Sequence, residues 1–373
     1  MKIALVGTRG IPASHGGFET CVEEVGARLV NKGHQVYVYS KIDPSNAGLK
    51  SYRGMRIIRI PRIPVQGLET LFSTVLSVIH SLFFKFDLHM VFNGANSPAL
   101  VIYKLLGKKF ALNTDGLEWQ REKWGKVGRN YYKLSERISV MVAKNLVSDS
   151  KGIQNYYLEK YKAPSTMIAY GAGVPPDYSQ KQVDSVLKEF RVKKFKYVLQ
   201  VTRFEPENNP LLTIEGFKLL GREDLSCLVI GGAPYNTPYL QQMISQAGQT
   251  SNIYLPGYVY QKECLDILWK HSLCYVHGNS VGGTNPALLQ AMAAGRPVLA
   301  LDCIFNREVL GDGGYYFSRA PRSIFGELKS VVDNISKAEL KAAEAVERIR
   351  RFYNWELIAE QYEKLFSKLV YDK

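Results

Sequence analysis

The stretch HGNSVGGTNPALLQAMAAGRPV, residues 277–298, spells a short helix with a glycine-rich approach. Asn285 suits an N-cap and Pro286 suits the first helical position, and a glycine follows the last apolar residues. The stretch lies between two short apolar runs, CYVHG (274–278) and PVLALD (297–302), which are typical of buried strands. It therefore predicts a strand–helix–strand unit of the kind that builds a parallel sheet.

The same alternation of short apolar runs and helical intervals extends over both halves of the chain, and the two series are separated by a Pro/Gly-rich stretch at 171–180. This pattern predicts an α/β protein made of two Rossmann-like domains, 1–172 and 186–354, whose parallel sheets face a central cleft. The runs that predict strands are 3–7, 35–40, 56–60, 89–93, 109–114, 146–150 and 166–171, followed by 197–203, 227–232, 252–257, 274–278 and 297–302.

Composition narrows the class of protein. Of 373 residues, 46% are hydrophobic and 22% are charged, which indicates a soluble globular protein. Five widely spaced cysteines without a Cys-x-x-Cys pair argue against a disulfide framework or a zinc site, and no secretory segment is evident, so a cytoplasmic location is expected. The apolar stretch 71–84 is shorter than the ~20 residues of a spanning helix and predicts a buried or interfacial helix.

The net charge of +14 is concentrated in the first half of the chain. Residues 1–175 contain 24 basic and 12 acidic residues, whereas residues 176–373 contain 24 and 22. Such asymmetry indicates an acidic partner for the first half, or a solvated surface. The segment from Trp119 to Arg137 combines six basic residues with Trp124, Tyr131 and Tyr132, so docking on an anionic membrane surface is one interpretation and an ordinary exposed helix is the other.

Several positions suit the binding of a phosphorylated ligand. The free N–H groups and dipole of the helix that begins near Asn285 favour an anion, and Gly283 lets a ligand approach the backbone. Arg203, directly after a predicted strand, suits a diphosphate clamp. Asp115, at another strand end, could orient a hydroxyl group or cap the next turn. The loop 7–20 is glycine-rich but lacks the Gly-x-Gly-x-x-Gly spacing of dinucleotide-binding proteins.

Metal ligands are not evident. The sequence has no Asp-x-Asp, and its six histidines show no ligand spacing. We therefore expect no metal and no cofactor, and we expect arginine and helix dipoles to neutralise a diphosphate.

Five motifs together resemble one family: GIPASHGGFET (10–20), NTDGLEW (113–119), SDSKGIQNYY (148–157), VTRFEPENN (201–209) and the stretch 277–298. They look like the bacterial retaining glycosyltransferases of the GT-B fold, family 4, in the branch that includes capsular and cell-wall rhamnosyltransferases. The likeness extends over essentially the whole chain. It implies a hexosyltransferase that transfers a sugar to a glycan or lipid-linked acceptor at the inner face of the cell membrane. The best guess for the sugar is L-rhamnose, with dTDP-rhamnose as the donor. No nucleic acid partner is expected.

The resemblance also implies roles for individual residues. Arg203 would hold the donor diphosphate and Asp115 would contact the donor sugar or the acceptor hydroxyl, and these two are the candidate catalytic residues. The closing helix, 355–373, would pack back on the first domain. The candidate donor-binding residues are Gly16, Gly17, Asn208, Gly283, Thr284, Asn285 and Gln290, and the candidate acceptor-binding residues are His15, Glu19, Glu118 and Trp119.

Two positions depart from the family pattern. Asn208 stands where the family usually has a lysine, and the Glu-x7-Glu signature reads Gly282 and Gln290. A neutral amide is a weaker acceptor than a carboxylate, although it can still bind a ribose hydroxyl. A catalytically weak or silent sugar-nucleotide-binding paralogue is therefore the main alternative. A nicotinamide-dependent dehydrogenase is a further one, against which the loop 7–20 argues.

Overall fold

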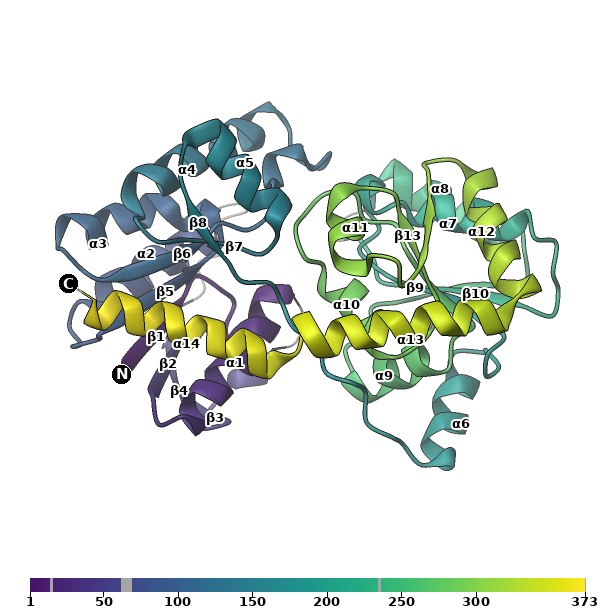
Figure 1. Cartoon of the computed structure of the whole chain (residues 1–373), viewed down its shortest axis with the longest axis horizontal. Coiled ribbons are helices and arrows are strands. Elements are labelled where there is room, and N and C mark those ends of the chain that lie inside the picture. The colour runs from purple at the N-terminus through teal and green to yellow at the C-terminus, as the bar shows by residue number, and fades with distance from the viewer. Residues whose placement is uncertain (14–15, 62–68, 234–235, 373) are drawn as a thin grey trace. The chain divides into compact units, whose positions relative to one another are not determined.

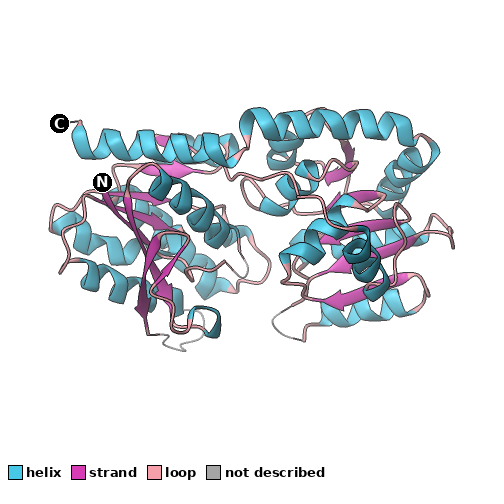
Figure 2. Cartoon of the chain, turned by 90° about the horizontal axis from the view of Figure 1, so that it is seen from below, coloured by secondary structure: helices cyan, strands magenta, loops and turns pink. Residues whose placement is uncertain are grey.

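The computed structural model describes residues 1–13, 16–61, 69–233 and 236–372. The chain divides into two compact units. Unit 1 consists of Met1–Gln120, Trp124–Gly171 and Trp355–Lys373, and unit 2 consists of Arg121–Lys123 and Ala172–Asn354. In each unit the strands form one sheet with helices on both faces (Figures 1 and 2).

Unit 1 is built on a sheet with the strand order β3-β4-β2-β1-β5-β6-β7-β8. Among the described strands only β3 is antiparallel to its neighbour. In chain order its elements are β1 (Lys2–Val6), α1 (Gly17–Asn31), β2 (Gln35–Lys41), η1 (Pro44–Asn46), β3 (Ser51–Tyr52), β4 (Met55–Ile60), α2 (Glu69–Ser81), β5 (Leu88–Phe92), η2 (Gly94–Leu100), α3 (Val101–Leu105), β6 (Phe110–Asn113), η3 (Glu118–Gln120), α4 (Lys126–Val142), β7 (Leu146–Ser148), α5 (Lys151–Tyr161), β8 (Ser165–Met167) and α14 (Trp355–Tyr371).

Unit 2 contains a parallel sheet with the strand order β11-β10-β9-β12-β13-β14. Its core lies between this sheet and α7, α8 and α12, where side chains such as Val198, Phe217 and Leu328 are buried together. The elements are α6 (Gln180–Glu189), β9 (Tyr197–Val201), η4 (Pro206–Asn208), α7 (Pro210–Lys218), β10 (Ser226–Ile230), α8 (Pro238–Gly248), β11 (Ile253–Gly257), α9 (Lys262–Lys270), β12 (Cys274–His277), α10 (Pro286–Ala293), β13 (Val298–Leu301), α11 (Ile304–Leu310), β14 (Tyr315–Phe317), α12 (Pro321–Asp333) and α13 (Ile335–Phe352).

The last helix returns to unit 1. α14 packs along α1, where Arg28 and Lys32 pair with Glu356 and Glu363 at 2.7 and 2.6 Å. Within α14, Tyr362 is buried and lies within 3.5 Å of the Asn113 side chain at the end of β6. Gly171 and Trp355, where the chain leaves unit 1 and re-enters it, pack tightly against each other. A Cβ on Gly171 would come within 2.6 Å of the Trp355 ring. α14 therefore forms part of the layer that covers the unit 1 sheet.

The strands predicted from the apolar runs are all present, and the α/β class is confirmed. Two strands were not predicted, β3 and β14. Both are edge strands of two or three residues, too short to produce a periodic signal. The apolar stretch 71–84 folds as α2 up to Ser81. No helix among the described residues combines the length and apolarity needed to cross a membrane.

Candidate functional site

The strand order of unit 2 reverses between β9 and β12, which are neighbours in the sheet. From β9 the chain proceeds to β10 and β11 on one side, and from β12 to β13 and β14 on the other. In open parallel sheets, ligands bind beyond the carboxyl ends of the strands at such a reversal. The loops that leave these two ends, 202–209 and 278–285, are therefore where a ligand site is expected.

These two loops are bonded to each other. The backbone N–H and hydroxyl of Ser280 both donate to the carbonyl of Glu207, at 3.0 and 2.9 Å, and the Asn209 side chain donates to the Gly278 carbonyl at 2.7 Å. Gly278 must be glycine, because a Cβ there would come within 2.3 Å of the Asn208 carbonyl oxygen. The carboxyl ends of β9 and β12 thus present one fixed backbone surface.

Arg203 is the second residue of the first of these loops, two residues after β9 ends. Its side chain is partly exposed, and its backbone carbonyl accepts a hydrogen bond from the Asn208 side chain at 3.0 Å. Asn208 itself is buried, so its side-chain amide holds the Arg203 loop in place. The structure places Arg203 with its guanidinium available to solvent and its backbone anchored.

The predicted helix 286–295 is present as α10. Its N-cap is Asn285, whose side chain accepts a hydrogen bond from the Ala287 N–H at 2.9 Å, and Pro286 occupies the first position. Gly282 adopts a φ of 133°, a conformation that favours glycine, and Thr284 is buried just before the cap. Gln290 lies one turn into the helix. Gly283, Thr284, Asn285 and Gln290 therefore all belong to the N-terminal end of α10 and its approach.

An acidic pair adjoins Arg203, and the sequence reasoning did not single it out. The Glu205 carboxylate lies 3.6 Å from the Arg203 guanidinium, and Glu207 is two residues further on. Both glutamates are buried, and neither carboxylate oxygen of Glu207 has a hydrogen-bond donor. A buried carboxylate normally acquires donors or a cation, so this pair marks a polar site.

Two cations of the segment Arg121–Lys123, which belongs to unit 2 by its contacts, neutralise the pair. Arg121 lies 3.7 Å from Glu207 and 3.9 Å from Glu205, and its side chain is 11% exposed. Lys123 lies 3.6 Å from Glu205. The interpretation of this segment as an exposed basic surface is therefore not supported for Arg121, whose side chain is largely covered, whereas Lys123 remains exposed.

Burial raises the pKa of the Glu207 carboxyl, and the neighbouring Glu205 carboxylate raises it further, whereas Arg121 and Lys123 act in the opposite direction. His277, at the end of β12, has neither ring nitrogen hydrogen-bonded, and its complete burial lowers its pKa to about 3. His277 is therefore neutral at physiological pH and contributes no charge to the site.

In unit 1 the strand order reverses between β1 and β5. The loop after β1 starts at Gly7, where a Cβ would come within 2.5 Å of the Phe92 carbonyl oxygen. The loop ends at Gly16, with a φ of 102°, and α1 begins at Gly17. Glu19 is engaged within this loop, because its carboxylate accepts a hydrogen bond from the Arg9 N–H at 2.9 Å. His15 lies outside the described residues.

A second site in unit 1 is a pocket, open to solvent, at the carboxyl ends of β5 and β6. Asn93 and Asp115 follow these two strands with φ of 73° and 65°, in the left-handed region that non-glycine residues rarely adopt. Such backbone conformations cluster at binding and active sites. The residues that line the pocket are Asn93, Gly94, Ala95, Thr114, Asp115, Gly116, Glu118, Tyr132, Glu136 and Tyr157.

The polar groups of this pocket are held in place by neighbours. The Asp115 carboxylate accepts a hydrogen bond from the Gly116 N–H at 2.8 Å. Glu136 is buried and accepts from the hydroxyls of Tyr156 and Tyr161 at 2.8 and 2.9 Å. Carboxylates beside aromatic rings are well suited to hydroxyl-rich ligands, because the oxygens accept hydrogen bonds and the rings cover apolar faces.

The aromatic residues between Trp119 and Arg137 pack into unit 1. The Trp119 ring lies 5.0 Å from the Lys133 ammonium and 5.5 Å from that of Lys160. Tyr131 donates to the Ala95 carbonyl at 2.7 Å, and Tyr132 lines the pocket. These rings therefore support the pocket rather than form an exposed aromatic surface.

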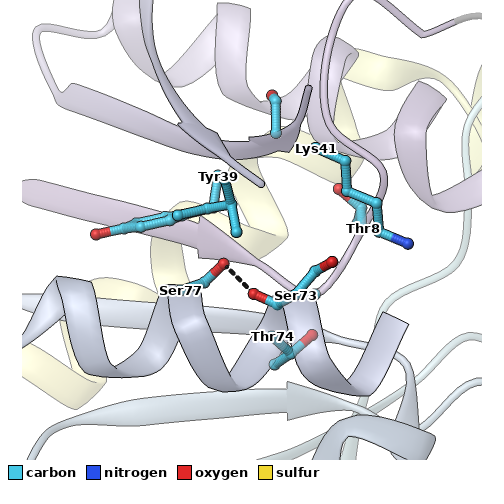
Figure 3. A pocket seen from close by; sticks show the side chains of 9 residues that line it. Thr8, Tyr39, Lys41, Ser73, Thr74 and Ser77 are labelled. Atoms are coloured by element: carbon cyan, nitrogen blue, oxygen red, sulfur yellow. Dashed lines mark hydrogen bonds between the residues drawn. The ribbon is translucent and has the colours of Figure 1, made fainter. Parts of the chain in front are cut away.

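Figure 3 shows another crevice of unit 1, at the carboxyl ends of β1 and β2, where hydroxyl groups of α2 face Thr8, Tyr39 and Lys41. The α2 hydroxyls are satisfied by their own helix, as when Ser77 donates to the Ser73 carbonyl at 2.7 Å. Lys41 pairs with Glu69 at 3.2 Å. The contacts across this crevice therefore hold α2 against the sheet.

Within the described ranges, no group of three or more His, Cys, Asp or Glu side chains could hold a metal ion. The structure brings the predicted donor residues of unit 2 to two adjoining loops and, for Gln290, to helix α10 that follows the second loop. The predicted residues of unit 1 fall at two strand ends, Gly16, Gly17 and Glu19 after β1, and Asp115, Glu118 and Trp119 after β6. The sequence did not indicate Glu205, Glu207, Asn93, Glu136 or Tyr157 as site residues, and it placed Tyr132 in the segment considered for membrane docking. A position after a strand end was the available signal for Glu205, Glu207 and Asn93.

Comparisons with known proteins agree with this architecture. Residues 184–351 match the model of "Glycosyl transferases group 1", and residues 95–173 match a "Domain of unknown function (DUF1972)". The chain is 24% identical, over 99% of its length and 99% of the relative's, to an uncharacterized glycosyltransferase of Methanocaldococcus jannaschii.

Solved structures show the same fold. HepE of Anabaena in complex with UDP and glucose superposes with a TM-score of 0.77 at 15% identity, covering 99% of this chain and 100% of that one. Sucrose-phosphate synthase of Thermosynechococcus elongatus gives 0.79 at 18% identity, covering 99% and 98%. The protein has the GT-B fold and is a nucleotide-sugar-dependent glycosyltransferase. Within the chain, the group 1 match lies in unit 2, at residues 184–351, and the DUF1972 match covers residues 95–173.

Proposed function

We propose that the protein transfers a sugar from a nucleoside diphosphate to an acceptor hydroxyl, with the donor held at the end of β9 and the N-terminus of α10 in unit 2. The observation that carries this proposal is the fixed pair of loops that present Arg203 and the capped α10 at the reversal of strand order. A structure similar to this one was solved with UDP-glucose, which supports a nucleotide-sugar donor. L-rhamnose from dTDP-rhamnose is the donor to test first, because the sequence motifs resemble the rhamnosyltransferase branch.

The chemistry follows from the charges. As the bond between the anomeric carbon and the diphosphate breaks, negative charge develops on the leaving oxygen. Arg203 and the N-terminus of α10 stabilise that charge, the kind of electrostatic effect that contributes most to many enzymes. The acceptor oxygen forms the new glycosidic bond on the same face, with retention, and its proton passes to the departing phosphate.

The acceptor is proposed to bind in the unit 1 pocket lined by Asp115 and Glu118, with Trp119, and with Glu19 at the neighbouring loop. Asp115 would orient the attacking hydroxyl. Carboxylates and tyrosines favour an uncharged glycan residue of a lipid-linked or free saccharide over a phosphorylated one, because like charges repel. Surface polysaccharide synthesis at the inner face of the cell membrane is the proposed setting.

The test is release of nucleoside diphosphate from a panel of nucleotide sugars that includes dTDP-rhamnose and UDP-hexoses, with and without bacterial lipid extract. We expect one donor to be consumed and its sugar to appear in the extract. Binding of a donor without consumption would favour the silent paralogue that Asn208 and Gln290 suggest. Binding of none would contradict the proposed function.

A further inference from the structure

Helix α2 buries small polar side chains and exposes large apolar ones, the opposite of an ordinary surface helix. Its buried face consists mainly of small polar side chains, among them Ser73, Thr74 and Ser77. Phe72 and Ile79, seven residues apart and therefore on one face, are exposed. A surface helix normally buries its large apolar residues, so this arrangement indicates that the exposed side has an apolar partner.

The exposed apolar side chains continue beyond α2. Phe83, just after the helix, is 82% exposed, and Leu105, at the end of α3, is 79% exposed. Leu106 and, on α4, Met141 are exposed as well. We call these six residues, Phe72, Ile79, Phe83, Leu105, Leu106 and Met141, the apolar face.

Contacts within unit 1 show that the three helices form one layer. The Ser81 hydroxyl at the end of α2 bonds to the Tyr103 hydroxyl of α3 at 2.7 Å. Lys104 of α3 donates to the Met141 carbonyl near the end of α4 at 2.6 Å. Figure 1 shows α2, α3 and α4 together on one side of the unit 1 sheet, opposite α1 and α14. The apolar face is therefore the outer side of a single layer.

The segments that carry this face are basic. Residues 69–110 and 126–144, which contain the three helices, hold nine basic and three acidic residues. Glu69 pairs with Lys41 and Glu136 is buried, whereas Asp87 is exposed and keeps its negative charge, so basic residues outnumber acidic ones in these segments. Lys85, Lys104 and Lys144 remain exposed.

We propose that the apolar face docks unit 1 on a bilayer that contains anionic lipid, with the large apolar side chains entering the headgroup region and the lysines pairing with phosphates. Apolar insertion combined with basic residues is the known physics of peripheral binding. A second copy of the chain fits the face less well, because two copies of the same basic surface repel each other. This inference rests on the proposed function in one respect: docking on the membrane would bring the enzyme to a lipid-linked acceptor.

The experiment measures co-sedimentation of the full chain with vesicles of phosphatidylcholine alone and with added phosphatidylglycerol. We expect binding to the anionic vesicles only, and weaker binding as salt rises from about 0.1 to 0.5 M. The double variant Phe83→Glu/Leu105→Glu should lose at least tenfold in affinity. The matched control is Leu340→Glu, which places a charge on a residue of α13 that is 74% exposed, and it should bind as the wild type does.

Folding and donor binding are measured on the same samples by circular dichroism and by titration with a nucleoside diphosphate. Intact donor binding with no vesicle binding by the wild type would overturn the inference and leave the proposed function standing. Equal binding by Phe83→Glu/Leu105→Glu would also overturn it. A lipid-free dimer that only this variant dissociates would instead identify the face as a contact between copies.

Discussion

The guanidinium of Arg203 lies 3.6 Å from the carboxylate of Glu205, so the cation proposed to hold the donor diphosphate has an anion beside it. Glu205 in turn lies near Arg121 and Lys123. The charge that a diphosphate meets at this site therefore depends on a small network and not on Arg203 alone.

Replacing Arg203 with alanine should weaken nucleoside diphosphate binding by roughly 2–4 kcal/mol, or about 30- to 1,000-fold, because a charged and potentially bidentate contact is lost. Isothermal titration calorimetry measures this directly. Arg203→Lys keeps the positive charge but lacks the planar guanidinium, so its affinity for the diphosphate should lie between those of the wild type and Arg203→Ala. Affinity equal to the wild type in Arg203→Ala would remove Arg203 from the donor site.

Charge balance around Glu205 can be tested by a double-mutant cycle. Arg121→Gln should weaken diphosphate binding about tenfold, since a carboxylate near Arg203 then lacks one of its cations. Glu205→Gln should strengthen binding, and Arg121→Gln/Glu205→Gln should return close to wild type. If the double variant binds as weakly as Arg121→Gln alone, Arg121 acts by some other means.

Glu207 provides a pH test. Its pKa is raised by burial, so the folded state holds this proton more tightly than the unfolded chain does. The cost of the buried carboxylate is absent below the unfolded pKa and grows as pH rises through the folded value. Glu207→Gln should therefore have a higher melting temperature than the wild type at pH 7, with the difference shrinking toward pH 4. A lower melting temperature at pH 7 would show that pairing with Arg121 outweighs the cost of burial.

Asp115→Asn should abolish transfer while leaving donor affinity unchanged, because the proposed role of Asp115 is to orient the acceptor. Asparagine has the same shape and tolerates the left-handed backbone of this residue, so the fold is preserved and only the charge is removed. Kinetics with saturating donor and varied acceptor measure the effect. Unchanged turnover would exclude Asp115 from the reaction.

The sequence predicted the parts of the molecule that depend on local signals. The apolar runs give the strands, and the Asn285–Pro286 pair gives the start of α10, because capping is decided within a few residues. The surroundings of Arg121 could not be predicted, since its partners Glu205 and Glu207 lie more than 80 residues away. The apolar composition of α2 was evident, but which side faces the sheet is a property of packing.

Hydrogen–deuterium exchange with and without a nucleoside diphosphate tests the central claim most directly, since it locates the ligand on the chain. The account predicts protection in residues 202–209 and 278–290, the two loops and the first turns of α10 in unit 2. Protection confined to the loop after β1 in unit 1, or none in either segment of unit 2 at saturating ligand, would contradict it.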